Sequence, residues 1–373
     1  MAAELPIKVL HISSESSWRG GEQQIIYLVE ESRKLGVDAV VACKFGSEVE
    51  KYCQTNNIPF ESLRFSSAYD LTTAYRIKKI CQERKIDLIQ THTSKSHTIA
   101  VISGLIGLNV PQIMTRRVDF PVKDNWFSRF KYNYSKIVRI ICISDTILKI
   151  TEKDIRDKTK LVSIHSGVDM DRFKDYRNSD WLRENYDKDK STHIIGNTSA
   201  ISDQKDYYTF VNVAKRILSE RQDVHFFIVG DGPDRKEIES YVKREGLADH
   251  ITLTGFKKNI KEILPSFEIF LFTSKTEGLG TSVLDAMAAG VPIVTTNAGG
   301  VSEMIEHEKN GLMYPVKDET GLTSGVLKLI NNPELAQQLS AQAEKTVQNF
   351  SKEKTASRTL ALYKEVLKEK AIR

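Results

Sequence analysis

Acidic residues and glycines are concentrated around one predicted turn, in the segment FTSKTEGLGTSVLDAMAAGVPIVT, residues 272–295. After a predicted strand that ends at Phe272, Glu277 enters the turn, and a predicted helix then carries Asp285. The turn consists of Gly278, Leu279 and Gly280. Glycines let backbone N–H groups approach a ligand closely, and the helix dipole favours negative groups. The segment therefore predicts a site for a ligand with phosphate and hydroxyl groups, the alternative being a capped helix with a solvated glutamate.

Two further glycine pairs stand directly after predicted strands, where a doubly wound domain binds phosphate. They are Gly20 with Gly21, and Gly230 with Gly232. Neither belongs to a G-x-G-x-x-G sequence, so neither supports dinucleotide binding well. A tight turn without a ligand is the alternative. The sequence contains no Walker A motif, no H-E-x-x-H and no G-x-S-x-G.

Polar residues also follow two predicted strands of the first half of the chain. His92 follows Asp87–Thr91, and Arg116 and Arg117 follow the strand that begins at Gln112. We assign His92 to the ligand site, the alternative being a histidine satisfied by the protein itself. His92 and His97 lack the i, i+4 spacing of a helical metal pair, and we expect no metal.

Short apolar runs alternate with helical patterns along the whole chain, which indicates βαβ units and parallel sheets. In the first half, the predicted strands are Ile7–Ile12, Asp38–Cys43, Asp87–Thr91, Gln112–Thr115, Arg139–Ile143 and Lys160–Ile164. In the second half, they are His193–Gly196, Val224–Val229, Ile251–Thr254, Ile269–Phe272 and Ile293–Thr296. We predict an α/β protein with two Rossmann-like parallel-sheet domains that face a central cleft, because ligands bind outside the carboxyl ends of such strands.

The domain boundaries follow from a change in composition. Residues 1–170 form the predicted N-terminal domain, and the polar, charge-mixed stretch 171–190 is the predicted linker. Residues 191–350 form the second predicted domain. Residues 351–373 form a predicted C-terminal helix that packs back on the first domain.

Composition excludes several classes of protein. The 373 residues are 40% hydrophobic and 28% charged, which excludes fibrous and disordered chains. A net charge of +5 without a recognisable module does not indicate a nucleic-acid reader. The four scattered cysteines suggest buried thiols rather than disulfides or zinc ligands. No apolar run is long enough for a membrane helix and no secretory leader is visible, so we expect a cytoplasmic location.

Six stretches, in order along nearly the whole chain, resemble the retaining, nucleotide-sugar-dependent glycosyltransferases of family 4, which have the GT-B fold. The segment 277–285 resembles the family signature of a glutamate, seven residues and a second glutamate. The other stretches are RGGEQQ (19–24), IHSGVDMDRF (164–173), VGDGPDR (229–235), TGF (254–256), and AGGVSEMI (298–305) followed by NGLMYP (310–315). The resemblance implies a transfer reaction that needs neither metal nor cofactor.

The resemblance also implies roles for residues of the glycine turn. Glu277 would lie beside the donor sugar, and the backbone from Gly278 to Thr281 would donate hydrogen bonds to the sugar and the diphosphate. Asp285 takes the place of the second glutamate, which accepts hydrogen bonds from both ribose hydroxyls in the family. Aspartate is one methylene shorter, so the same geometry requires a small shift of the helix or the nucleotide.

The family places an arginine and a lysine near the start of the second domain, where they neutralise the diphosphate leaving group. Lys205 fits the lysine, whereas the arginine position falls near Ser199 and is vacant. The substitute we predict is the pair Arg116 and Arg117, since Arg117 falls where the family commonly has a histidine that touches the donor sugar. Pairing of Arg117 with Asp119 is the structural alternative.

The function that follows is transfer of a sugar from a nucleotide-diphosphate-sugar to a hydroxyl of a glycan, a lipid-linked glycan or a small molecule. Lys205, Arg117 and the N–H groups of Gly20, Gly21 and Gly280 would stabilise the charge on the diphosphate. A nucleotide-sugar epimerase and a degenerate sugar-nucleotide-binding module are the alternatives. The basic, aromatic stretch 123–139 fits a peripheral contact with the inner face of the membrane, or a helix that packs its aromatic side chains on the sheet.

Overall fold

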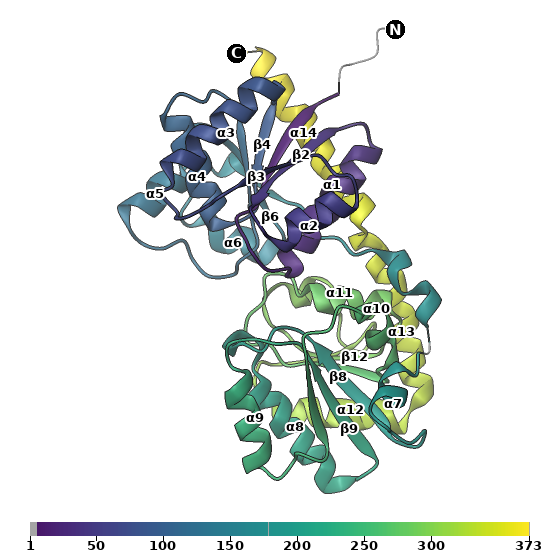
Figure 1. The fold of residues 1–373 in the computed structure, drawn as a ribbon. Coiled ribbons are helices and arrows are strands. Elements are labelled where there is room, and N and C mark those ends of the chain that lie inside the picture. The colour runs from purple at the N-terminus through teal and green to yellow at the C-terminus, as the bar shows by residue number, and fades with distance from the viewer. Residues whose placement is uncertain (1–5, 178, 373) are drawn as a thin grey trace. The chain divides into compact units, whose positions relative to one another are not determined.

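The computed structural model describes residues 6–177 and 179–372 (Figure 1). The chain forms two compact units. The N-terminal unit comprises the residues up to Gly167 together with those from Lys352 onward, and the C-terminal unit comprises Val168–Ser351. Each unit contains one parallel sheet with helices on it, so the prediction of two Rossmann-like α/β domains is confirmed.

The sheet of the N-terminal unit has seven strands in the order β3-β2-β1-β4-β5-β6-β7. Their bounds are Lys8–Ile12 (β1), Asp38–Lys44 (β2), Phe60–Leu63 (β3), Leu88–Thr91 (β4), Gln112–Arg116 (β5), Ile137–Cys142 (β6) and Leu161–Ser163 (β7). The strand order reverses between β1 and β4, which pair in register from Val9 opposite Leu88. In an open parallel sheet this reversal is the point where ligands bind, outside the carboxyl ends of the strands.

Helices and short 3-10 turns connect these strands. They are α1 (Gly20–Lys34), α2 (Glu48–Thr55), α3 (Leu71–Arg84), α4 (Ser94–Leu105), α5 (Trp126–Tyr132), α6 (Asp145–Glu152) and η1 (Lys158–Lys160). Several begin at the residue type that caps a helix, such as Thr93, whose hydroxyl accepts a hydrogen bond from the Ser96 N–H of α4 at 3.2 Å. The caps fix where each helix starts relative to the strand before it.

The last helix, α14 (Lys352–Ile372), packs along α1 of the N-terminal unit (Figure 1). Tyr363, which is fully buried, donates a hydrogen bond to Gln90 of β4. Arg139 of β6 pairs with Glu365 and Glu369 at 2.6 and 2.5 Å. Helix α14 is thereby fastened to a sheet whose strands all come from the first half of the chain.

The sheet of the C-terminal unit has six strands in the order β10-β9-β8-β11-β12-β13. Their bounds are His193–Thr198 (β8), Val224–Val229 (β9), Ile251–Gly255 (β10), Ile269–Phe272 (β11), Ile293–Thr296 (β12) and Leu312–Tyr314 (β13). Every residue of β9, β11 and β12 is buried, as expected for parallel strands covered on both faces. Here the strand order reverses between β8 and β11.

The remaining elements of the C-terminal unit surround this sheet. They are η2 (Met170–Tyr176), α7 (Trp181–Asn185), η3 (Asp203–Lys205), α8 (Tyr207–Glu220), α9 (Arg235–Arg244), α10 (Ile260–Ile263), η4 (Leu264–Ser266), α11 (Thr281–Ala288), η5 (Gly299–Glu303), α12 (Glu319–Asn331), α13 (Pro333–Val347) and η6 (Gln348–Phe350). Side chains of α8, α9 and α12 share one hydrophobic cluster with the strands, including Phe210, Ile238 and Val326. This cluster holds the loops after β8 and β11 in place.

The structure differs from the sequence-based expectations at three places. The short strands β3 and β13 were not predicted, since they have only 4 and 3 residues and only one residue in each is buried. The stretch 171–190, expected to link the domains, belongs to the C-terminal unit and contains η2 and α7. Phe173 and Leu182 are fully buried there, so two apolar side chains anchor an otherwise polar segment.

The described part of the chain contains no helix that is long and apolar enough to cross a membrane. The four cysteines, Cys43, Cys53, Cys81 and Cys142, are free and buried, as the sequence suggested. Burial raises the pKa of all four thiols, to about 12 for Cys43, Cys53 and Cys81. They remain protonated at neutral pH and offer no reactive thiolate.

Candidate active site

Lys205 and Glu277 form an ion pair in the C-terminal unit, at the point where the strand order reverses. Lys205 lies in the loop after β8 and Glu277 in the loop after β11, and these two strands are neighbours in the sheet. The Lys205 Nζ donates to Glu277 Oε1, to which Ser274 Oγ also donates at 2.8 Å. Only 19% of the lysine and 11% of the glutamate side chain is exposed. The topology therefore brings together the two residues on which the predicted chemistry depends most.

The loop that carries Lys205 is held against the strand that leads to Glu277. Thr273 donates from its hydroxyl to the carbonyl oxygens of Lys205 and Asp206, at 3.1 and 3.2 Å. The Lys275 N–H donates to the Gln204 carbonyl oxygen at 2.8 Å. The ammonium group of Lys205 lies 5.1 Å from the centroid of the Phe272 ring. These contacts fix the lysine in position before any ligand arrives.

The glycine turn leads directly into α11, as predicted. Gly280 is the residue before the helix and has a φ of +88°, a conformation that side chains rarely adopt. Leu279 is buried and anchors the turn, and Thr281 is the first residue of the helix. The Gly300 N–H donates to the Glu277 carbonyl oxygen at 3.2 Å, and a Cβ at Gly299 would clash with that oxygen. The stretch AGGVSEMI thus packs closely against the backbone of Glu277 and holds it in place.

Asp285 lies on α11 with a quarter of its side chain exposed. Its carboxylate is 3.9 Å from Nη1 of Arg172, which comes from the stretch IHSGVDMDRF. Burial raises the pKa of Asp285 to about 6, although Arg172 opposes the shift and Asp169 adds to it. A carboxylate in this state can accept hydrogen bonds at neutral pH and is neutralised by mild acid.

The vacant arginine position is filled by a hydroxyl network. Ser199 donates to Asn197 Oδ1 at 2.7 Å and lies 2.8 Å from the hydroxyl oxygen of the buried Tyr207. A Cβ at Gly230 would clash with the Ser199 carbonyl oxygen, and a Cβ at Gly232 with that of Ile201. The glycines after β9 therefore allow two loops to pack closely together.

In the N-terminal unit, Gly20 and Gly21 begin α1, and Arg117 lies beside them. A Cβ at Gly21 would lie 3.8 Å from Cδ of Arg117. Arg117 donates to Ser166 Oγ at 3.2 Å, so its hydrogen bond goes to the residue after His165 rather than to Asp119. Burial lowers the pKa of Arg117 to about 10, and the buried carboxylate of Glu22 opposes this shift. The guanidinium remains charged at neutral pH beside the N-terminus of a 15-residue helix.

His92 is buried at the end of β4 and pairs with His11 of β1. His11 Nδ1 and His92 Nε2 are 3.1 Å apart, and the rings are stacked with centroids 5.3 Å apart. Burial lowers the pKa of His11 to about 3 and that of His92 well below its ordinary value. His92 is thus a neutral histidine with a protein partner on one nitrogen, and a role in donor binding stays a prediction.

Arg116 turns away from the position that we predicted for it. Its guanidinium donates to the hydroxyl of Tyr132 at 2.5 Å and to the carbonyl oxygen of Phe120. The physical reason is the alternation of side chains along a strand, which sends Arg116 and Arg117 to opposite faces. Arg117 lies with Gly21, and Arg116 lies with α5 and the loop before it.

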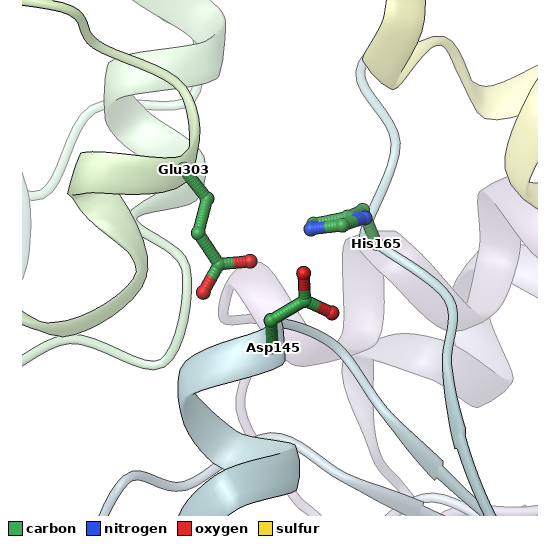
Figure 2. A group of neighbouring side chains, drawn as sticks. All are labelled: Asp145, His165 and Glu303. Carbon is green, nitrogen blue, oxygen red and sulfur yellow. The ribbon is translucent and has the colours of Figure 1, made fainter.

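Asp145 and His165 of the N-terminal unit are near one another (Figure 2), with a carboxylate oxygen and a ring nitrogen no more than 4.8 Å apart. Two ligand atoms are fewer than the three protein ligands of a catalytic zinc site. Glu303, also drawn there, belongs to η5 of the other unit. We assign no metal to the pair, and metal independence stays a prediction.

Sequence reasoning missed several residues that shape these sites. Ser274, Ser166 and Arg172 contact Glu277, Arg117 and Asp285, respectively. Arg172 lies in the stretch IHSGVDMDRF, but nothing in its spacing indicates a carboxylate partner. Ser274 lies three residues before Glu277, and that spacing in a loop carries no periodic signal.

Comparison with known families and proteins places the chain among glycosyltransferases. Residues 18–172 match the model of Glycosyltransferase Family 4, and residues 178–346 match the model of Glycosyl transferases group 1. The N-acetyl-alpha-D-glucosaminyl L-malate synthase of Bacillus anthracis is 26% identical over 310 residues, 81% of this chain and 80% of that protein. The UDP-Gal:alpha-D-GlcNAc-diphosphoundecaprenol alpha-1,3-galactosyltransferase of Escherichia coli is 22% identical over 96% of each chain.

Solved structures agree with this placement at the level of the fold. HepE of Anabaena, in complex with UDP and glucose, matches with a TM-score of 0.84 and 18% identity over 96% of this chain and 100% of that one. A glycosyltransferase from Rickettsia africae matches with a TM-score of 0.83 and 20% identity over 97% and 99%. Since the two family models together span most of the chain, and each half forms the expected parallel sheet, the protein belongs to the family 4 glycosyltransferases and has the GT-B fold.

Proposed function

We propose that the protein transfers a sugar from a nucleotide-diphosphate-sugar to an acceptor hydroxyl with retention of anomeric configuration. The observation that carries the proposal is the ion pair of Lys205 and Glu277, next to a glycine turn at the N-terminus of α11. The point where the strand order reverses thus has a cation, a carboxylate and a helix N-terminus. This combination suits a ligand that has both phosphate groups and sugar hydroxyls.

In the proposed reaction, the bond between the anomeric carbon and the diphosphate oxygen breaks, and a bond from the acceptor oxygen to that carbon forms on the same face. The acceptor proton passes to the departing phosphate oxygen. Lys205 and the first N–H groups of α11 stabilise the charge that grows on the diphosphate. Glu277 accepts hydrogen bonds from the donor sugar and stabilises the positive charge that develops at its ring. Neither a covalent nucleophile nor a metal ion is required.

Arg117 supplies the second cation of the proposal. It stands beside Gly20 and Gly21 at the start of α1, where phosphate oxygens can meet backbone N–H groups and a guanidinium together. Asp285 is assigned to the ribose, since it lies on α11 directly after the glycine turn and part of its side chain is exposed. HepE, a structural neighbour, has been crystallised in complex with UDP and with UDP-glucose, so UDP-sugars are the first donors to test.

A peripheral membrane contact belongs to the same proposal, because the name of the Escherichia coli relative includes a diphosphoundecaprenol-linked sugar. The segment around α5 exposes aromatic side chains: Trp126 is 78% and Phe120 51% exposed. Trp126 stacks on Phe130, and Tyr69 of the loop between β3 and α3 contacts Phe127. Aromatic side chains with lysines and arginines beside them suit the interface of an anionic membrane. Co-sedimentation with vesicles of anionic phospholipid tests this, and Trp126→Ser should weaken it.

Turnover tests the central proposal. The purified protein is incubated with UDP-, GDP- and ADP-sugars and a panel of sugar, glycerol and polyprenyl-diphosphate acceptors, and nucleotide release is followed. Release that depends on an acceptor, with an α-configured product from an α-configured donor by NMR, is the expected result. Reversible isomerisation of the donor sugar would instead indicate an epimerase. Tight binding of a nucleotide sugar with no turnover on any acceptor would indicate a binding module.

A further inference from the structure

Two cations, Arg116 and Lys131, are buried side by side in the N-terminal unit. Arg116 at the end of β5 is 3% exposed, and Lys131 on α5 is 6% exposed. Both lie against the ring of Tyr132, 5.4 and 5.6 Å from its centroid. Burying a charge is costly unless an opposite charge compensates it.

Both cations donate their hydrogen bonds to neutral oxygens. Lys131 Nζ donates to Thr98 Oγ1 at 3.2 Å and to Ser94 Oγ at 3.4 Å, which leaves one of its three N–H donors without an acceptor among the described residues. Arg116 uses Tyr132 and the Phe120 carbonyl, and its buried Nε has no partner in the part of the chain that the structure covers.

No carboxylate offsets these charges within the described residues. Burial lowers the pKa of Lys131 to about 8, and the positive charges of Arg116 and Lys123 lower it further. Asp154 acts on the phenol of Tyr132, but its carboxylate accepts a hydrogen bond from the Val122 N–H at 3.3 Å and forms no ion pair with either cation. The two buried cations therefore have no anionic partner among the residues that the structure describes.

The two serine and threonine partners of Lys131 stand on the first turns of α4. This helix has 12 residues, and its N-terminus carries the positive end of its dipole. Thr93 caps the Ser96 N–H and accepts the His97 N–H through its carbonyl oxygen, whereas no acceptor is recorded within the described residues for the N–H groups of Ser94 and Lys95. Ser94 is exposed, so a ligand can reach this point from solvent.

A further buried donor or acceptor lies beside the cations. The imidazole of His97 is 2% exposed, its Nε2 has no partner among the described residues, and its ring meets that of Tyr132 edge on. The cluster thus combines a helix N-terminus with nearly buried polar atoms of Lys131, Arg116 and His97 that the protein itself leaves unused.

We propose that Lys131, Arg116 and the N-terminus of α4 bind an oxyanion, a carboxylate or a phosphate, carried by the acceptor. That the anion belongs to the acceptor rests on the proposed transferase function. That an anion binds here does not depend on it. Arg116 is thereby assigned to the acceptor instead of the donor. The ammonium and guanidinium groups bind the two oxygens of the anion, and the N–H groups of Ser94 and Lys95 complete the site.

Calorimetric titration of the full chain with inorganic phosphate and with malonate, at constant ionic strength, tests the inference without donor or turnover. Lys131→Met removes one cation while keeping an apolar stem, and we expect it to weaken binding of at least one of the two anions about tenfold or more. Lys149→Met is the matched control: this lysine is exposed on α6 and its loss should leave both affinities unchanged. Without anion, Lys131→Met should melt no lower than the parent protein, because an unpaired buried charge is removed.

Phosphate could also bind beside Arg117, so Arg117→Gln is titrated in parallel. Weaker anion binding in Lys131→Met and persistent binding in Arg117→Gln, with amide NMR shifts at Ser94 and Lys95, is the expected result. Loss of binding in Arg117→Gln with full binding in Lys131→Met would overturn the inference, as would no binding of either anion to the parent protein. A protein that binds the anion at this site but transfers no sugar would contradict the proposed function and leave the anion site standing.

Discussion

Removal of the Lys205 ammonium is the sharpest test of the proposed chemistry. In Lys205→Ala, the Glu277 carboxylate keeps the Ser274 hydroxyl as a partner but loses the ammonium group. Only 11% of the Glu277 side chain is exposed, so water compensates little for this loss. Breaking a buried pair on one side costs about 3–5 kcal/mol, and an exposed pair contributes about 0–1 kcal/mol. For this intermediate case we expect the free energy of unfolding to fall by about 1–3 kcal/mol, measured by urea denaturation.

The catalytic loss has a different origin and is expected to be larger. If Lys205 neutralises charge that grows as the diphosphate leaves, its removal should lower kcat by about 10²–10³-fold, which corresponds to about 2.7–4 kcal/mol of transition-state stabilisation. The dissociation constant of the donor should change less, because the diphosphate gains part of its charge only during the reaction. Glu277→Gln keeps the size of the side chain and should impair transfer while leaving nucleotide affinity nearly intact.

A double variant separates the two effects. Lys205→Ala combined with Glu277→Gln leaves no uncompensated carboxylate, so much of the lost stability should return while kcat stays low. Lys275→Ala is the matched control, since this neighbouring lysine pairs with the exposed Asp203 at 2.6 Å and should affect neither quantity much. Recovery of kcat together with stability in the double variant would refute a direct role of Lys205. Wild-type kcat in both single variants would remove the catalytic assignment altogether.

Three further outcomes are expected. Arg117→Ala should lower kcat severely, because the vacant position near Ser199 leaves more charge to the remaining cations, whereas Asp119→Asn should be mild because Arg117 bonds to Ser166; steady-state kinetics of both variants decide this. The donor KM should rise as the pH falls through about 6, where Asp285 gains a proton and loses an acceptor, and Asp285→Asn should abolish this dependence. The raised pKa also means that protonation of Asp285 favours the folded state, so this group adds stability as the pH drops below 6. Transfer should persist in EDTA at essentially the full rate, and loss that Mn²⁺ or Mg²⁺ restores would contradict metal independence.

The parallel-strand pattern made most of the fold predictable. Buried strands such as Val224–Val229 and Ile269–Phe272 are continuous apolar runs, and the structure has them at the predicted bounds. The loops after them are where ligands bind in such sheets, so Glu277 and Lys205 could be placed at one site without knowledge of their contact. The short strands β3 and β13 could not be predicted, because pairing with a neighbour, and not burial of their own side chains, defines them.

Arg116, the last residue of β5, and Arg117, which follows it, show why the candidate site could be predicted only in part. Arg116 and Arg117 form a single basic pair in the sequence, and either could stand in for the missing arginine. In the sheet, the alternation of side chains divides them, so that Arg117 joins Gly21 and Arg116 joins Lys131 and Tyr132. The sequence shows that both residues are charged but not which face of the sheet each side chain lies on. A shift of one residue in the register of β5 would exchange the two faces and therefore the two roles. If the anion site at α4 is correct, the pair serves two ligands, and Arg116→Gln should weaken acceptor binding while Arg117→Gln weakens donor turnover.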